Sequence, residues 1–449
     1  MSQGKKQSGM SIVNLQAVSL AAVAIFGLQS TASAVDLDAT IQATVMATDN
    51  VARQGTGELD EIVSTVGLRF QLLEASPRLV ATVTGDLSYQ DYKEGTFDGE
   101  TINFMEAALA YGFIPGRLVW RFENTSGQQV VNPLQPSNPG NRQDTNVFST
   151  GPDVILPLGI DRTELHFSAR YQNTGFEVAN ADNDRFGLQS ALQRRLTRNS
   201  TLGLVYSNSE IEFDSDSNNQ DFRRDELVLS YQLSSERTEL SIEAGINKLK
   251  LDGETSSEGE EFSLNLERLM TPSSTLAFSA GRTLSDTGDL FRLFQGNAQG
   301  IDLTADFQAT GDPFVSDFVN LSYAVAKPRT EFQISVAMFA EDYETQTLLN
   351  RDRFSLNIDV SRQVTRLINA DIELGYTERD FTELDRVDKD RFASLELNRD
   401  IGRVVNAGLG VRYFDRDSSQ VGVDANETQY FFRISYGFFG RREFRAPGG

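Results

Sequence analysis

The chain has 449 residues, a formal net charge of −23, one histidine, one tryptophan and no cysteine. The acidic balance argues against nucleic acid as a partner, because a polyanion would be repelled. A single histidine excludes a zinc site built from several histidines, and the lack of cysteine excludes disulfide bonds. We therefore expect neither a metal site nor a cofactor.

Residues 1–34 have the three parts of a secretory signal peptide. Lys5 and Lys6 provide the positive charge, an apolar run follows, and the small-residue pattern Ala-Ser-Ala ends at Ala34. This order predicts export and cleavage after Ala34. No later segment approaches the roughly 20 apolar residues that a membrane-spanning helix needs.

Most of the region 35–439 alternates between apolar and polar residues. In "TELHFSARYQN", Leu165, Phe167 and Tyr171 fall on one face, and His166 falls on the other. A period of two is typical of a β-strand with two unlike faces. In a soluble sandwich the apolar face would point to the core, whereas in an outer-membrane barrel it would point to lipid.

The connections between the alternating segments decide between these two folds. Nine short turns, such as "EASPR", "IPGR", "SSER" and "DIGR", alternate with longer acidic segments such as "NPLQPSNPGNRQD" and "RDSSQVGVDANE". Tight periplasmic turns and longer extracellular loops are typical of outer-membrane barrels. The sequence therefore predicts an all-β fold, a transmembrane antiparallel up-and-down β-barrel. We expect about 20 strands of about 9 to 13 residues, with about 18 as the alternative count.

Two segments depart from the regular pattern. Residues 285–313 are too few for two further crossings, so we expect a long extracellular loop or an inward-folded plug that forms the constriction. The last strand, "TQYFFRISYGFF", carries a cluster of aromatic residues suited to the membrane interface. Residues 440–449 follow it as a short C-terminal tail, so that the barrel domain is predicted to span 35–439.

Transport function would depend on the residues that line the lumen. The alternation predicts eleven such polar residues of mixed sign: Glu164, His166, Arg170, Glu243, Glu267, Arg282, Asp359, Asp371, Glu373, Arg412 and Arg433. Rings of one charge would have indicated ion selectivity. The mixed lining leaves two interpretations open, a hydrated polar pore and an interior braced by ion pairs.

Catalytic chemistry finds little support in this sequence. His166 lies a few residues after a short turn, at the wrong end of the barrel for an outer-rim active site, so we predict no enzyme. The stretch 214–225 resembles a calcium-binding loop at its first positions. It fails at the sixth position, where Asn219 replaces Gly, and at the twelfth, where Asp225 replaces Glu. We therefore interpret it as a solvated acidic loop.

Several stretches together resemble a known group of proteins. "DEIVSTVGLRFQLLEASPRLVATVTGDLSYQDY", "LVWRFENTSGQQ" and "NRQDTNVFSTGPDVILPLG" are similar to outer-membrane barrels encoded with exosortase (PEP-CTERM) and exopolysaccharide systems, and to the broader β-barrel porin group. The resemblance implies a Gram-negative outer-membrane protein that serves export or assembly of a surface polysaccharide. It implies no catalytic or binding residue.

Two functional hypotheses follow from these predictions. The first is a porin-like conduit linked to exopolysaccharide export or surface assembly. The second is a plugged structural barrel whose acidic extracellular loops bind polysaccharide or lipopolysaccharide. Outer-membrane lipids, lipopolysaccharide and the barrel-insertion machinery are the expected partners in both cases.

Overall fold

The computed structural model describes residues 35–438 except for a few short gaps, namely 160–161, 215–218, 254–255, 287 and 289–310. The predicted signal peptide and the predicted C-terminal tail lie outside the described residues. Among the described residues, no helix has the length and apolar character needed to cross a membrane.

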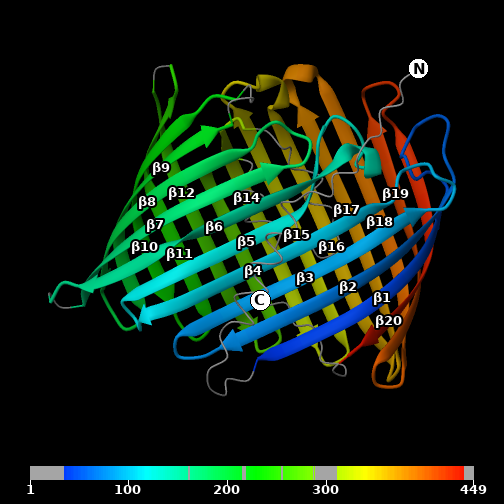
Figure 1. The fold of residues 1–449 in the computed structure, drawn as a ribbon, viewed down its shortest axis with the longest axis horizontal. Coiled ribbons are helices and arrows are strands. Elements are labelled where there is room, and N and C mark those ends of the chain that lie inside the picture. The colour runs from blue at the N-terminus through cyan, green and yellow to red at the C-terminus, as the bar shows by residue number, and fades with distance from the viewer. Residues whose placement is uncertain are drawn as a thin grey trace, which may run out of the picture.

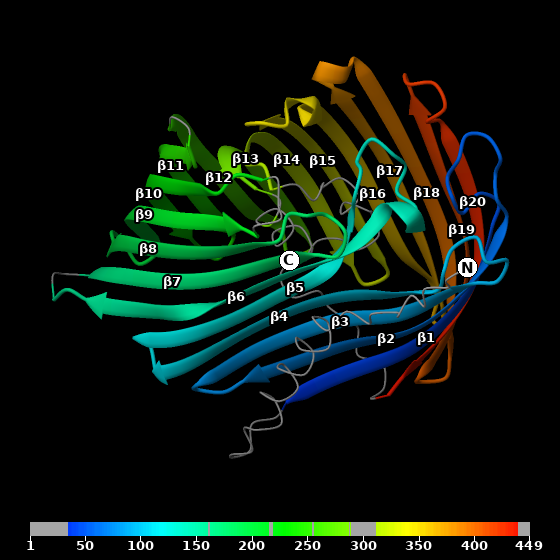
Figure 2. The same cartoon turned by 45° about the horizontal axis from the view of Figure 1, so that its top comes forward.

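The described chain forms one closed sheet of 20 antiparallel strands (Figures 1 and 2). Each strand pairs with the next one in sequence, and β1 (Asp36–Thr48) pairs with β20 (Ala425–Gly437) to close the ring. Because every strand has two neighbours, the backbone N–H and C=O groups of the wall are paired without an open edge. The prediction of an all-β up-and-down barrel with about 20 strands is confirmed.

The strands between β1 and β20 run from the blue to the orange end of the ribbon in Figure 1. Their bounds are β2 Glu61–Ala75, β3 Leu79–Tyr92, β4 Glu100–Ile114, β5 Leu118–Val130, β6 Arg142–Pro157, β7 Thr163–Phe176, β8 Asn183–Arg195, β9 Ser200–Phe213, β10 Phe222–Ser234, β11 Thr238–Leu251, β12 Ser257–Thr271, β13 Ser274–Ser285, β14 Phe314–Lys327, β15 Thr330–Tyr343, β16 Arg351–Thr365, β17 Ile368–Phe381, β18 Arg386–Ile401 and β19 Val405–Ser418.

Short and long connections alternate around the barrel, as the sequence predicts. The hairpins that begin with β2, β4 and every second strand up to β18 have turns of two to five residues, and the connections at the other end have four to twelve residues, apart from the much longer β13–β14 connection. We call the two rims the short-turn end and the long-loop end. In the part of the chain that the structure describes, three short 3-10 turns lie at the long-loop end: η1 (Pro139–Asn141), η4 (Thr347–Leu349) and η5 (Thr382–Leu384).

The apolar face of the strands points outward. Leu409 is 63% exposed, Ile246 61% and Phe432 50%, whereas polar residues one position away point to the interior. Exposed apolar side chains form a belt around the whole sheet, a surface suited to lipid rather than water. The apolar face of residues 163–173 lies on this outer side, because Phe167 and Tyr171 are exposed.

The strands have 12 to 16 residues and are therefore longer than predicted. Beyond the apolar belt, their outer face carries charged pairs toward the long-loop end. Arg391 on β18 bonds Asp415 on β19 at 2.6 Å, and both lie on the same face as the apolar residue Leu395. The sheet thus extends past the roughly 9 to 11 residues that a tilted strand needs to cross a bilayer.

Apolar packing inside the barrel is concentrated near the long-loop end. Ile211, Phe222, Leu249, Leu251 and Leu284 form one buried cluster across β9–β11 and β13. A second cluster joins Phe314, Tyr343 and Leu349. These clusters brace the rim from which the long loops emerge.

Glycines on the inner wall test how tightly the sheet packs. A Cβ at Gly410 on β19 would lie 2.3 Å from the ring of Phe431 and 2.9 Å from the carbonyl oxygen of Leu395. We expect Gly410→Ala to lower the free energy of unfolding by about 1 to 3 kcal/mol, because a well-packed site must shift.

Gly375→Ala on β17 is the matched control, since the nearest atoms there lie 3.5 Å away, at ordinary contact distance. Denaturant unfolding of both variants in detergent checks the prediction. Equal midpoints for the two variants would contradict the packing described for β19.

Candidate functional site: the inner wall and the mouth of the barrel

Ten of the eleven predicted lumen residues lie on the face opposite the apolar belt. In each case the neighbouring strand position belongs to the outward face, as for Arg433 between Phe432 and Ile434, which are 50% and 44% exposed. These ten are Glu164, His166, Arg170, Glu243, Glu267, Asp359, Asp371, Glu373, Arg412 and Arg433. Their contact with a permeating solute stays a prediction.

The prediction was wrong for Arg282. Its register partner on β12 is Phe262, which is 42% exposed on the outer face, and its Nη1 bonds Asp317 at 2.9 Å. Arg282 therefore lies on the outer surface beyond the apolar belt. The outer face becomes charged near the long-loop end, so a charge in the alternation does not by itself mark the inner face.

The wall of β16–β20 brings five of the predicted residues together. Asp359 stands directly opposite Glu373 in the register of β16 and β17. The hydroxyl of Ser361 and the amide of Asn398 donate to Asp371, at 2.6 and 2.9 Å. Arg433 pairs with Glu396 on β18. Asp371 and Arg433 are thus bonded within the wall, as in an interior braced by ion pairs, whereas Asp359 and Glu373 make no hydrogen bond or ion pair among the described residues.

Arg412 lies in the same wall, next to β20. Its guanidinium carbon is 4.4 Å from the centroid of the Phe431 ring, within the range of a cation–π contact. The stacking fixes the side chain against the wall rather than across the lumen.

The other predicted residues lie in separate groups. Arg170 and Arg121 both donate to Asp153, each at 2.5 Å. His166 Nε2 lies 3.4 Å from Glu164 Oε2, close to the short-turn end. The structure thus does not assemble these residues into one site.

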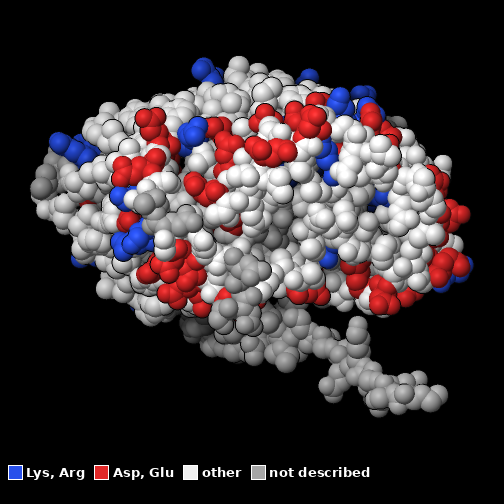
Figure 3. Space-filling model, turned by 90° about the horizontal axis from the view of Figure 1, so that it is seen from above, with Lys and Arg blue, Asp and Glu red and all other residues white. Residues whose placement is uncertain are grey.

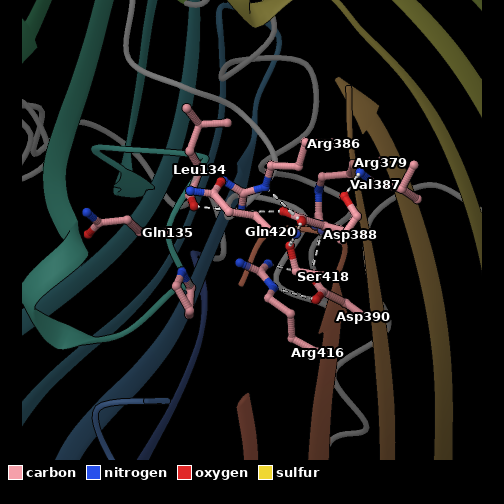
Figure 4. A network of polar contacts seen from close by, with 12 residues as sticks. Leu134, Gln135, Arg379, Arg386, Val387, Asp388, Asp390, Arg416, Ser418 and Gln420 are labelled. Carbon is pink, nitrogen blue, oxygen red and sulfur yellow. Dashed lines mark hydrogen bonds and ion pairs between the residues drawn. The ribbon is translucent and has the colours of Figure 1, made fainter. Parts of the chain in front are cut away.

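The densest polar network was not predicted from the sequence. Arg379 and Arg416 converge on Asp390, with three contacts of 2.6 Å, and Arg386 pairs with Asp388 at 2.7 Å (Figure 4). All five side chains are almost fully buried on the inner face of β17–β19, near the long-loop end. The alternation in "RVDKDR" signals the face, but it does not show which partners meet.

Arg386 also holds a loop from the far side of the mouth. Its Nη2 donates to the carbonyl oxygen of Leu134 at 2.7 Å, and its Nη1 donates to Gln420 at 2.8 Å (Figure 4). Leu134 belongs to the β5–β6 connection, residues 131–141, which we call the strap. In the strand order, β1–β4, β19 and β20 separate the strap from β18, so the strap reaches across part of the mouth.

The strap is internally braced and has a second attachment. The side chain of Asn141 donates to the carbonyls of Asn132 and Pro136, at 2.9 and 3.1 Å. Arg53 donates to the carbonyl of Ser137, and Asn138 donates to that of Ala52, each at 2.9 Å. The strap, which Figure 2 shows over the mouth, is thus bonded to Arg386 on one side and to residues of the β1–β2 loop on the other.

The β13–β14 connection enters the barrel at its described start. Asp286 pairs with Arg185 on β8, and a Cβ at Gly288 would lie 3.3 Å from Thr174 on β7. Both Arg185 and Thr174 are buried on the inner face. β13 pairs directly with β14, so no strand lies between them. Most of the predicted constriction, residues 285–313, lies outside the described residues, because residues 287 and 289–310 are not described.

Acidic groups dominate the surface at the mouth. Figure 3 views the molecule from above, and Asp and Glu cover more of the visible face than Lys and Arg. In the β7–β8 loop, burial raises the pKa of Asp182, and the negative charge of Asp214 raises it further. A raised carboxyl pKa means that the folded state takes up a proton more readily, so this loop gains stability as the pH falls.

The described residues contain no group of three or more His, Asp or Glu side chains arranged to hold a metal ion. The calcium-loop-like stretch 214–225 is described only in part, because residues 215–218 lie outside the described chain. Within the described residues, the polar contact of the His166 side chain is with Glu164.

Comparison with known proteins gives similarity of shape only. No family model and no curated protein matches the chain. The FrpB iron transporter of Neisseria meningitidis is 9% identical and covers 92% of this chain and 82% of its own, with a TM-score of 0.46. A ferric enterobactin receptor (PfeA) of Pseudomonas aeruginosa is 10% identical, and the match covers 89% of this chain and 81% of the receptor, with a TM-score of 0.48.

A third structure, OccK3 (OpdO) of Pseudomonas aeruginosa, is 11% identical and covers 90% of this chain and 96% of its own. Its TM-score is 0.37. Similarities at this level do not bear on the solute or the mechanism of this chain.

The contact between Arg386 and Leu134 gives a direct test of the strap. We expect Arg386→Gln to loosen the strap, because losing a charged hydrogen bond costs about 1.5 to 3 kcal/mol, which corresponds to about a tenfold or larger shift in the population of the open state. Since the chain has no cysteine, a single Cys introduced at Pro133, which is buried in the strap, reports this change through its rate of maleimide labelling.

Arg391→Gln is the matched control, because Arg391 is an outward-facing arginine of the same strand that pairs with Asp415. We expect labelling at position 133 to rise in the Arg386 variant alone. The same rate in both variants would show that Arg386 does not hold the strap.

Proposed function

We propose that this protein is an outer-membrane conduit for polar solutes. The observation that carries the proposal is the orientation of the two strand faces, which is the reverse of that in a soluble protein. Apolar side chains point outward and polar side chains point inward along most of each strand. A barrel of this size is wide enough for an aqueous lumen unless loops fill it. The exported outer-membrane location rests on the predicted signal peptide and on the lipid-suited belt.

The link to exopolysaccharide export or surface assembly is part of the same proposal. It is supported by the resemblance of three sequence stretches to barrels encoded with exosortase and exopolysaccharide systems. We also propose that the protein is not an enzyme, because its one histidine faces the lumen at the short-turn end, beside a glutamate and far from the mouth.

A second candidate function is a plugged barrel whose acidic loops bind polysaccharide or lipopolysaccharide at the cell surface. Two observations favour it. The strap is held across part of the mouth by Arg386 and Arg53, and Asp286 enters the barrel to reach Arg185. Both contacts narrow the entrance from the long-loop end.

Single-channel recording of the purified, refolded protein in a planar bilayer tests the conduit. We expect steady conductance with a weak preference for cations, because the predicted lining and the surface at the mouth have an acidic excess. Heat-modifiable migration on gels serves as the control for folding.

Absence of conductance from protein that is shown to be folded would contradict the conduit and favour the plugged barrel. In that case the variant Arg386→Gln, in which we expect the strap to be released, tests whether the strap or another part of the barrel blocks the lumen. Conductance in the variant alone would identify the strap as the block.

A further inference from the structure

A recess on the inner wall carries hydrogen-bonding groups that the fold itself does not use. It has a volume of about 500 Å³ and runs across β10–β14 in the half of the barrel nearer the short-turn end. Six of its polar side chains are Gln232, Glu239, Ser241, Asn265, Glu267 and Asn320. Outward-facing residues of the same strands, such as Leu229, Phe262 and Leu321, belong to the apolar belt.

The six side chains are unengaged. Within the described residues, none of them takes part in a side-chain hydrogen bond or an ion pair. Gln232, Glu239 and Asn265 are exposed to the lumen, and the other three are half-buried. The Oδ1 atom of Asn320 is shielded from solvent and has no hydrogen-bond partner. Buried polar atoms are normally bonded, so such an acceptor calls for an explanation.

Part of the wall of β16–β20 behaves differently. There Asp371 accepts from both Ser361 and Asn398, and Arg433 pairs with Glu396, so these polar groups brace the sheet. Asp359 and Glu373 stand opposite each other in the same wall and make no hydrogen bond or ion pair among the described residues. The recess differs from this pair in that six unbonded side chains line one hollow of about 500 Å³.

The charges of the recess define the class of solute. Glu239 and Glu267 stand directly opposite each other in the register of β11 and β12, and the lining of the recess contains neither Lys nor Arg. Like charges in opposite positions destabilise a sheet unless something neutralises or solvates them. Hydroxyls and amides of Ser, Asn and Gln both donate and accept, which suits a hydroxyl-rich molecule.

We propose that this recess is a binding site for a saccharide that carries a positively charged amine. The Ser, Asn and Gln side chains bond the sugar hydroxyls, and Glu239 and Glu267 hold the ammonium group between β11 and β12. An acidic sugar is disfavoured by the same two carboxylates. The inference rests on the proposed conduit only in that the lumen must admit the solute.

Isothermal titration calorimetry of the folded protein in detergent tests the site with three trisaccharides. The probes are a glucosamine trimer, its neutral N-acetylated counterpart and a galacturonic acid trimer. We expect the glucosamine trimer to bind most tightly and the acidic trimer most weakly. Glu239→Gln and Glu267→Gln should each weaken binding of the amine by about twofold to fivefold, as expected for a solvent-exposed ion pair.

Asp359→Asn is the matched control, because Asp359 is an inner-wall carboxylate outside the recess with no ion-pair partner among the described residues. We expect this variant to bind the glucosamine trimer like the parent protein. Equal affinity for the three probes, absence of binding, or an equal loss in the Asp359 variant would each overturn the proposal.

Conductance recorded on the same preparations separates the two proposals. Conductance without saccharide binding would contradict the proposed binding site and support the proposed conduit. Saccharide binding in micelles without conductance in the bilayer would support the binding site and contradict the conduit.

Discussion

The pairing of β1 with β20 is the constraint on which the rest of the structure depends. Nine register partners join the two strands, from Thr40 opposite Gly437 to Thr48 opposite Gln429. Without this closure, both strands would expose unpaired N–H and C=O groups, each of which costs several kcal/mol in hydrocarbon. Closure also fixes the geometry of the lumen, because strand number and tilt together set the diameter of a barrel. The belt, the inner wall and the mouth are consequences of that ring.

In the closed sheet, the inner and outer faces differ only in their side chains. The alternation of apolar and polar residues along each strand separates the two faces with few exceptions. Apolar residues cover the outer face, whereas the inner face divides into walls of different character. In the wall of β16–β20, Asp371 and Arg433 are bonded within the sheet, whereas the six polar side chains of the recess on β10–β14 have no side-chain partner among the described residues. The strap, held by Arg386 and Arg53, links distant parts of the mouth.

The sequence predicts the fold well because its signals are local. Alternation specifies the strands, and turn length specifies which end each hairpin faces, so that the class and the count of about 20 follow directly. Arg282 shows the limit of the alternation pattern. A charged residue can lie on the outer surface beyond the apolar belt as well as in the lumen, so its charge alone does not identify the face. The network around Asp390 and the contact of Arg386 with Leu134 join residues from β17, β18, β19 and the strap. Such contacts depend on closure and loop path, which no local pattern encodes.

The orientation of the two faces in a bilayer is the central claim, and spin-label accessibility along β15 tests it most directly. Because the chain has no cysteine, and because positions 333 to 338 contain no glycine, single Cys residues can be placed at each of these positions without background. In lipid nanodiscs, labels at 334, 336 and 338, whose register partners on β14 belong to the apolar belt, should be relaxed by oxygen, which partitions into lipid. Labels at 333, 335 and 337 should be relaxed by a water-soluble nickel complex. The opposite pattern of relaxation at the two sets of positions, or uniform relaxation by the nickel complex at all six positions, would contradict the account.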